Sequence, residues 1–206
     1  MLVAPTSDNY YYGRVYPAVH CKTVTERELQ FFITASDGGL TPKFRGYETH
    51  GQAPRFYYDM YSDAWDQDLA VSRTTFRNWT PEEVDALVEA LFRLPGMLHS
   101  LHLLGIVHRD FAGRNVMIRR ERPFNQPKFS IALIDFGHSA SLALPQVWEA
   151  SYYLEDFEED VQEDNKRLRD FMCQIGWETN RVELCCEICE RCQKQRALRE
   201  PQAAKK

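Results

Sequence analysis

The feature that most constrains this chain is a polar loop in its middle that is enclosed by apolar segments. The loop HRDFAGRN runs from His108 to Asn115, and it follows a predicted helix that stops at Gly105. It precedes the apolar run Val116–Ile118, and a second apolar run, Ile131–Ile134, leads directly into the turn DFG at residues 135–137. Short apolar runs bounded by polar turns are typical of buried strands. The sequence therefore predicts a helix, a polar loop and two strands, the second of which ends in an acidic turn.

Both polar turns carry a recognisable spacing. His108, Arg109, Asp110 and Asn115 fit the pattern H-R-D-x-x-x-x-N, and residues 135–137 fit D-F-G. With these motifs and their flanking elements, the chain resembles the protein-kinase superfamily. Asn115 and Asp135 are twenty positions apart, which is longer than usual for that family, but a loop over 119–130 accommodates the extra residues.

The resemblance implies an α+β fold of the two-lobed protein-kinase type. The N-lobe would be reduced and the C-lobe shortened and mainly helical. We expect a single domain over residues 1–206, with the N-lobe at about 1–61, the C-lobe at about 62–195 and a tail at about 196–206.

The resemblance also implies roles for the motif residues. Phosphoryl transfer from ATP depends mainly on positioning and charge stabilisation. Asp110 would accept or orient the proton of the substrate hydroxyl, with His108 and Arg109 as the other members of the catalytic motif. Asn115 and Asp135 would supply the oxygen ligands that Mg²⁺ prefers. ATP and Mg²⁺ are therefore the expected cofactors. The alternatives are that the motif residues are ordinary polar residues of loops, or that the chain has a kinase fold without catalysis.

The N-terminal part matches the family less well. No G-x-G-x-x-G precedes residue 39. Lys22 is the candidate phosphate-binding lysine and Glu28, on the following helix, its candidate partner, although a solvated lysine and the glutamate of a Thr25 capping box explain the two equally well. A strand predicted at Arg55–Tyr61 would bring Met60 close to the adenine of ATP.

Two helix starts have the spacing of a capping box, Thr25–Glu28 and Thr80–Glu83, and each precedes apolar residues at helical spacing. The first helix should stop near Asp37–Gly39, which is a turn signal. Pro95-Gly96 should kink or break the second, because proline cannot donate a backbone hydrogen bond.

The substrate is less constrained than the chemistry. Only 69 residues follow Gly137, and we find no A-P-E segment, so the usual platform for a peptide substrate is reduced or absent. Ala112 and Arg114 stand where tyrosine kinases have a similar alanine and arginine in this loop. Arg109 stands where kinases of small molecules usually have glycine. A protein hydroxyl is the leading acceptor. A small-molecule kinase of the aminoglycoside or choline phosphotransferase type, and a pseudokinase binding module without turnover, are the alternatives.

Composition limits the partners. The formal net charge is −5, which disfavours a nucleic-acid binder, and no segment reaches the roughly 18 apolar residues that span a bilayer. We expect a soluble, cytoplasmic protein without a membrane partner, and the sequence leaves the oligomeric state open. Seven of the fifteen residues 151–165 are acidic. A solvated helix or loop is favoured there over a docking site for a basic substrate.

Six cysteines occupy positions 21, 173, 185, 186, 189 and 192 and are expected to be thiols. Cys186, Cys189 and Cys192 have the C-x₂-C-x₂-C spacing of an iron–sulfur run, but Arg196 stands at the fourth ligand position. On a helix predicted for 180–206, Cys185, Cys189 and Cys192 would share one face. Buried thiols that pack as small apolar groups are favoured over a metal site.

Overall fold

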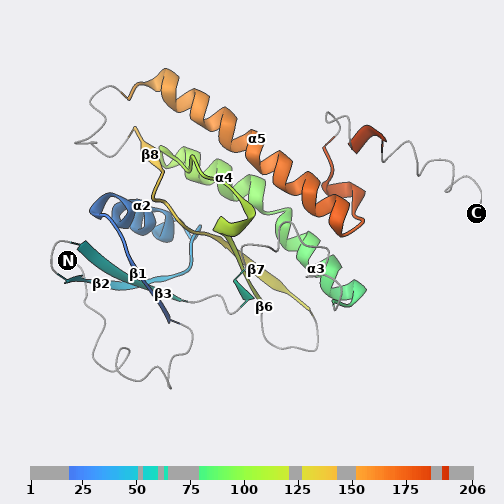
Figure 1. The fold of residues 1–206 in the computed structure, drawn as a ribbon, viewed down its shortest axis with the longest axis horizontal. Helices are drawn as coiled ribbons and strands as arrows, with labels where there is room; N and C mark the ends of the chain where they lie inside the picture. The colour runs from blue at the N-terminus through green and yellow to red at the C-terminus, as the bar shows by residue number, and fades with distance from the viewer. Residues whose placement is uncertain are drawn as a thin grey trace, which may run out of the picture.

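The computed structural model of the chain describes residues 19–50, 53–59, 63–64, 79–120, 127–142, 152–186 and 192–194, and it shows a mixed fold of helices and strands (Figure 1). Its elements follow in the order β1 (Val19–Thr23), α2 (Glu26–Asp37), β2 (Phe44–His50), β3 (Ala53–Asp59), β4 (Asp63–Ala64), α3 (Pro81–Leu91), α4 (Leu94–Leu103), β5 (Ile106–Val107), η2 (Gly113–Asn115), β6 (Val116–Arg120), β7 (Phe129–Leu133), β8 (Ala140–Ser141), α5 (Leu154–Glu178) and η3 (Val182–Leu184).

The first sheet is antiparallel, in the order β1-β3-β2, and α2 packs against it. Phe32 on α2 fixes this packing, with its ring centroid 4.5 Å from that of Phe56 and 5.3 Å from that of Tyr58 on β3. The predicted start of α2 is confirmed, because Thr25 is the N-cap and its hydroxyl accepts from the Glu28 amide at 3.1 Å. Aromatic packing of this kind anchors α2 at a fixed place on the sheet.

The second sheet contains the two strands predicted from the apolar runs. β6 and β7 pair as an antiparallel hairpin with Val116 opposite Leu133, and β4 pairs with the free edge of β6. Beyond the last strand pair, the Ile134 amide donates to the Asn115 carbonyl at 3.0 Å. The hairpin therefore places the end of the HRDFAGRN loop beside the start of the DFG turn.

The helix predicted after Thr80 is confirmed, including the reciprocal capping box with Glu83. A break in this region is also confirmed, but its position differs from the prediction: α3 ends at Leu91, and Pro95 lies in the first turn of α4. Proline is well tolerated there, because the first backbone N–H groups of a helix have no partner within the helix. α4 ends before Gly105, which has a φ of 71°.

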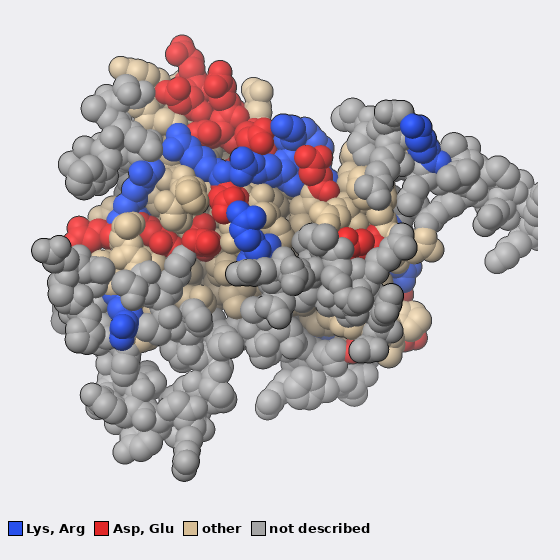
Figure 2. All heavy atoms as spheres, in the orientation of Figure 1, with Lys and Arg blue, Asp and Glu red and all other residues tan. Residues whose placement is uncertain are grey.

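The acidic stretch forms the first half of α5, a helix of 25 residues that packs against α4 (Figure 1). Acidic side chains gather in Figure 2 where Figure 1 shows the start of this helix, and a row of basic side chains lies directly below them. Glu155 and Glu158 are exposed, as expected for a solvated helix, but Asp164 is fully buried. One residue of the acidic stretch therefore has a role inside the protein.

The predicted helix over 180–206 is wrong for the part that the structure describes near its start. Asn180 has a φ of 64°, in the left-handed region that ends helices. A 3₁₀ turn at Val182–Leu184 and a bend at Cys185 follow. The described cysteines after α5 therefore do not lie on one continuous helix.

Among the helices of the described ranges, none is both long enough and apolar enough to cross a membrane.

Candidate active site

The Asp110 carboxylate lies between a cation and an amide of its own loop. Arg114 Nη2 lies 2.5 Å from Asp110 Oδ1 and 2.6 Å from Oδ2. Asn115 Nδ2 donates to the Asp110 carbonyl at 2.8 Å and to Oδ2 at 3.1 Å. These contacts are possible because η2 turns the chain back at residues 113–115. They hold the carboxylate at a fixed position beside β6.

These neighbours also set the charge of Asp110. Partial burial raises the pKa of the carboxyl, but the hydrogen bonds and charge of Arg114, together with the Asn115 amide, outweigh this effect, so the pKa lies below its usual value of 3.8. Asp110 is therefore ionised at neutral pH. Such a carboxylate is a weak base that can accept a hydrogen bond from a hydroxyl and orient it.

A buried carboxylate on α5 fixes the backbone of the loop. Asp164 is fully buried, and it accepts from the amides of His108 at 2.7 Å and of Arg109 at 2.9 Å. His102 Nε2 lies 3.3 Å from the same carboxylate. Arg109 has a φ of 62°, a left-handed conformation that costs about 1–3 kcal/mol in a residue with a side chain. The two amide hydrogen bonds from successive residues stabilise this strained turn.

The Arg109 side chain also binds α5. Its Nε donates to Asp160 Oδ2 at 2.7 Å, and its guanidinium lies over the Tyr152 ring, 4.7 Å from the centroid. The Tyr152 hydroxyl donates to the same Asp160 oxygen at 2.8 Å. Arg109 therefore pairs with a carboxylate of the chain itself.

A second cation of α5 reaches the same loop. Arg167 Nη1 donates to the Arg109 carbonyl at 2.6 Å and lies 3.8 Å from Asp110 Oδ1. Its Nε also binds Glu163, which keeps the guanidinium in this orientation. Arg167 therefore supports the turn at Arg109 and adds positive charge close to Asp110.

The DFG turn lies next to this loop and to α2. Asp135 has a φ of 65°, the second strained residue of the site. A Cβ placed on Gly137 would lie 3.6 Å from Asp135 Oδ1 and 3.6 Å from Glu28 Oε2. Glu28 is only 6% exposed, so its carboxylate lies inside the protein beside the DFG turn. α2 and β7 therefore bring two carboxylates close to the same glycine.

The buried rings of Phe136 and His108 pack against each other between the two loops. The Phe136 ring is 5.1 Å from that of His108 and 6.2 Å from that of Phe32 on α2. His108 is fully buried, and its Nε2 lies 3.0 Å from the Ile134 carbonyl oxygen. Burial lowers the pKa of His108, although the nearby Asp164 acts in the opposite direction. His108 is thus a neutral group that links the two loops.

The structure brings most of the predicted residues together. Asp110, Asn115, Asp135 and Glu28 meet around the end of the β6–β7 hairpin. The backbone of Lys22 lies in β1 opposite Phe56, but its side chain is outside the description. Met60 lies outside the described residues, so its predicted place near the adenine stays a prediction.

Three residues of α5 that support the loop were not predicted: Asp160, Asp164 and Arg167. One signal was available in the sequence. Asp164 lies four, seven and eleven positions before Leu168, Phe171 and Ile175, so it falls on the apolar face of the helix. A carboxylate in that position must find partners inside the protein.

Comparisons with known proteins give two findings. Residues 64–158 match the model of the lipopolysaccharide kinase (Kdo/WaaP) family, which is a kinase family. The match includes the HRDFAGRN loop, the DFG turn and the start of α5, and it covers just under half of the chain. It confirms the predicted resemblance to kinase-like proteins, and it is consistent with the prediction of an enzyme of the phosphotransferase class.

The second finding is a solved structure, described as a crystal structure of Rad53 kinase domain and SCD2 in complex with AMPPNP. It is 16% identical, with a TM-score of 0.42, and the alignment covers 59% of this chain and 43% of that chain. This chain therefore spans less than half the length of that chain. A search of curated proteins finds no match.

Proposed function

We propose that the chain transfers a phosphoryl group from ATP to a hydroxyl group. The observation that carries this proposal is that one end of the β6–β7 hairpin brings together three residues with oxygen-bearing side chains: Asp110, Asn115 and Asp135. Two of these, Asp110 and Asn115, are in direct contact, and Asp135 follows the residue that pairs with Asn115. A binding module without turnover would not need all three in this arrangement.

The donor set fits Mg²⁺. Asn115 directs its amide nitrogen to Asp110, which leaves the amide oxygen as its ligand atom, and Asp135 offers a carboxylate. Oxygen ligands from one or two such groups, completed by phosphates and water, are what Mg²⁺ requires. A bound Mg²⁺ would neutralise charge on the phosphates. We assign Asn115 and Asp135 as its ligands.

Asp110 would orient the attacking hydroxyl. Its lowered pKa suits a group that accepts a hydrogen bond from the substrate and takes the proton late in the reaction. Arg114 lies on the outer side of this carboxylate and is exposed, so an incoming substrate can replace its contacts. Arg109 and His108 would act on the position of Asp110 rather than on the substrate, because their side chains bind Asp160 and the Ile134 carbonyl.

The ATP site would lie between two lobes, the first sheet with α2 and the remainder of the chain. The Glu28 carboxylate supports this arrangement, because it extends from α2 to Gly137 of the DFG turn, and we propose that it pairs with a lysine of β1. Lys22 is our candidate for that lysine, and Met60 for a contact to the adenine. Both assignments rest on the sequence alone.

Two acceptor classes follow from different observations. The HRDFAGRN loop favours a hydroxyl on a protein side chain, because its arginine is typical of protein kinases. The family match favours a sugar hydroxyl, because lipopolysaccharides are built largely from sugars. The two are distinguished by the product, a phosphoprotein or a phosphorylated saccharide.

A turnover assay with ATP and Mg²⁺ tests the proposal. The wild-type chain is compared with Asp110→Asn and Asp135→Ala, and Glu158→Gln serves as the control because Glu158 is an exposed carboxylate of α5. We expect both site variants to lose at least about 100-fold in kcat, while the control stays within twofold. Equilibrium binding of ATP in the presence of Mg²⁺ should weaken in Asp135→Ala and persist in Asp110→Asn.

Two outcomes would overturn the proposal. If the wild-type chain binds ATP but transfers no phosphoryl group to a protein, a saccharide or water, it is a binding module without turnover. Turnover that survives both substitutions would remove these residues from the site.

A further inference from the structure

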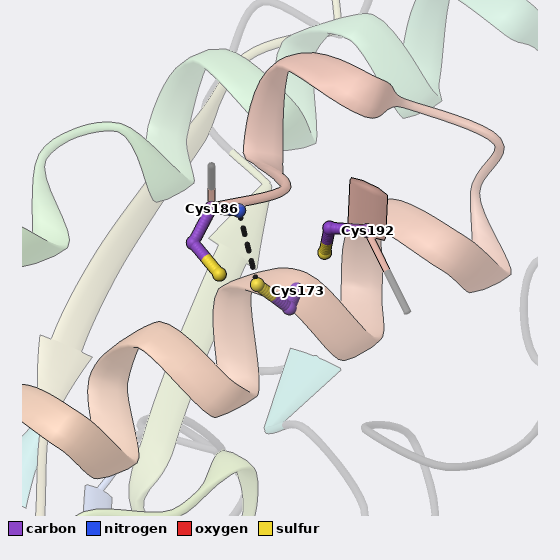
Figure 3. A group of neighbouring side chains, drawn as sticks. All are labelled: Cys173, Cys186 and Cys192. Atoms are coloured by element: carbon purple, nitrogen blue, oxygen red, sulfur yellow. Dashed lines mark hydrogen bonds between the residues drawn. The ribbon is translucent and has the colours of Figure 1, made fainter. Parts of the chain in front are cut away.

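A cluster of cysteines lies at the end of α5 that is remote from the candidate active site. Cys173 is on α5, Cys186 follows η3, and Cys192 lies in the helical segment described at residues 192–194. Their three sulfur atoms lie within 4.8 Å of one another (Figure 3). None of the three forms a disulfide. Three separate segments of the chain therefore direct soft ligand atoms to one place.

We propose that Cys173, Cys186 and Cys192 bind a single structural Zn²⁺ ion. Zinc–thiolate bonds are about 2.3 Å long, so sulfur atoms on one tetrahedral ion lie about 3.8 Å apart. The observed separation of at most 4.8 Å needs only a small inward movement of the side chains. The fourth tetrahedral position is completed by water or by a further side chain.

The surroundings of the sulfur atoms suit a metal–thiolate centre. Cys173 is 2% exposed and Cys192 is fully buried, and the Trp177 side chain packs against the cluster, so bulk water is largely excluded. The Cys186 amide donates to Cys173 Sγ at 3.1 Å (Figure 3). A hydrogen bond of this kind stabilises negative charge on sulfur, which a metal-bound thiolate carries.

The spacing of the sulfur atoms favours one ion over the alternatives. In a [4Fe–4S] cluster each cysteine binds a different iron, so the cysteine sulfur atoms are farther apart than around a single ion, and a [2Fe–2S] cluster takes four cysteines where this site has three. A disulfide would pair two of the cysteines and exclude the third. Thiolate ligands select Zn²⁺ or Cu⁺ among the common biological cations, and a structural zinc site is closed by four ligands, of which these cysteines would supply three.

The metal would hold the segment after α5 against that helix. Gly176 lies three residues after Cys173, and a Cβ there would come within 2.9 Å of Cys185 Sγ, so this segment already packs closely on α5. Cys173 is nine residues from Asp164, or about 14 Å along the helix axis. The zinc site is therefore structural and independent of the proposed catalytic function.

Burial also raises the pKa of Cys173, in spite of the hydrogen bond from the Cys186 amide. Without a metal this cysteine is a neutral thiol at neutral pH. Zinc binding must then release its proton, so the affinity for zinc should rise with pH.

The first test is the metal content of the full chain, produced with zinc in the medium, kept reduced and dialysed against a weak chelator. We expect inductively coupled plasma mass spectrometry to find about one Zn²⁺ per chain, with little iron or copper. Titration of the metal-free protein with Co²⁺ should give the thiolate charge-transfer and tetrahedral absorption bands of a sulfur-bound ion. This titration uses the wild-type chain and does not depend on a variant that folds.

Variants locate the site. Cys173→Ala and Cys192→Ala should each weaken zinc binding at least about 100-fold, whereas Cys185→Ala should keep it. Cys185 is the matched control, because it is next to Cys186, buried like Cys173 and Cys192, and not among the three sulfur atoms. A strong chelator should lower the Tm of the wild type and of Cys185→Ala but leave that of Cys192→Ala unchanged.

Three results would overturn the proposal. The wild-type chain could bind no zinc or cobalt above the level of Cys192→Ala, which would leave three packed thiols. It could contain iron with acid-labile sulfide, which would mean an iron–sulfur cluster. Finally, Cys185→Ala and Cys173→Ala could lose zinc to the same extent, which would place the metal elsewhere.

Discussion

The hydrogen bonds of Asp164 to the catalytic loop give the sharpest prediction, and Asp164→Asn is the substitution that tests it. The carboxylate accepts from two successive amides, those of His108 and Arg109, at 2.7 and 2.9 Å in a fully buried place. Asparagine has the same shape, but it offers one acceptor oxygen and directs an NH₂ group at the second amide. One hydrogen bond is therefore lost and the other loses its charge.

The magnitude follows from these two changes. A buried hydrogen bond to a charged group contributes about 1.5–3 kcal/mol, and replacing a charged acceptor with a neutral one costs about 1 kcal/mol. We expect the free energy of unfolding to fall by about 3 kcal/mol. Domains are typically stable by about 5–15 kcal/mol, so the variant should still fold at 25 °C.

Activity should change more than stability alone explains. Without two acceptors, the left-handed turn at Arg109, with its φ of 62°, can relax, and Asp110 then moves away from the attacking hydroxyl. We expect kcat to fall about 100-fold, while the KM for ATP changes less than threefold because Asn115 and Asp135 keep their places. Loss of packing alone would not separate kcat from KM in this way.

The assay is urea unfolding followed by circular dichroism, with steady-state kinetics on the same preparations. Glu158→Gln removes an exposed carboxylate from the same helix and should change the free energy of unfolding by less than about 0.5 kcal/mol. If Asp164→Asn behaves like this control in both stability and kcat, the carboxylate does not hold the loop and our reasoning is refuted.

Three other predictions concern pH and packing. Arg114→Ala should raise the pKa of Asp110, because the guanidinium lowers it, and any inflection from this carboxyl in a profile of kcat/KM against pH should move upward. Burial lowers the pKa of His108 below 6.5, so just below that pH the unfolded state binds more protons than the folded state. The free energy of unfolding should therefore fall as the pH drops below about 6.5, by up to about 1.4 kcal/mol per pH unit. Urea titrations measure this slope, and His108→Gln should lack this part of it. Gly176→Ala should lower the free energy of unfolding by about 1–3 kcal/mol, since its Cβ would lie 2.7 Å from a backbone oxygen. Gly96→Ala, in a helix with nothing within 4 Å of the new Cβ, should raise it by up to about 1 kcal/mol, and equal effects of the two substitutions in urea unfolding would contradict the packing argument.

Local signals in the sequence were sufficient for most of the elements. The Thr25 and Thr80 caps, the stop of the first helix and the two strands around residues 119–130 depend on neighbours within a few positions, which is why the sequence reveals them. The break before Pro95 was displaced because proline can begin a helix as well as end one. The prediction of one helix over 180–206 for the cysteines is wrong because Asn180 adopts a left-handed conformation, which the pattern of apolar residues does not predict.

The candidate site was predictable as far as its motifs extend. Asp110, Asn115 and Asp135 follow from spacing, but the partners of Arg109 do not, because Asp160 lies 51 positions away in the chain. Contacts over such distances are set by how α5 packs against α4, which a local pattern does not encode. The buried Asp164 was hidden for another reason: it stands in a run of acidic residues that, taken together, indicates a solvated surface.

The contacts of His108 explain why the two strained turns of the site can be held together. Its amide donates to the Asp164 carboxylate, and its ring Nε2 lies 3.0 Å from the carbonyl oxygen of Ile134, the residue before Asp135. Its Nδ1 finds no hydrogen-bond partner among the described residues, so the neutral ring carries its proton on Nε2 and donates to that carbonyl. The Ile134 amide in turn donates to the carbonyl of Asn115. A path of hydrogen bonds thus runs from α5 through His108 to both turns, and the neutral imidazole that burial favours supplies it with the proton on Nε2.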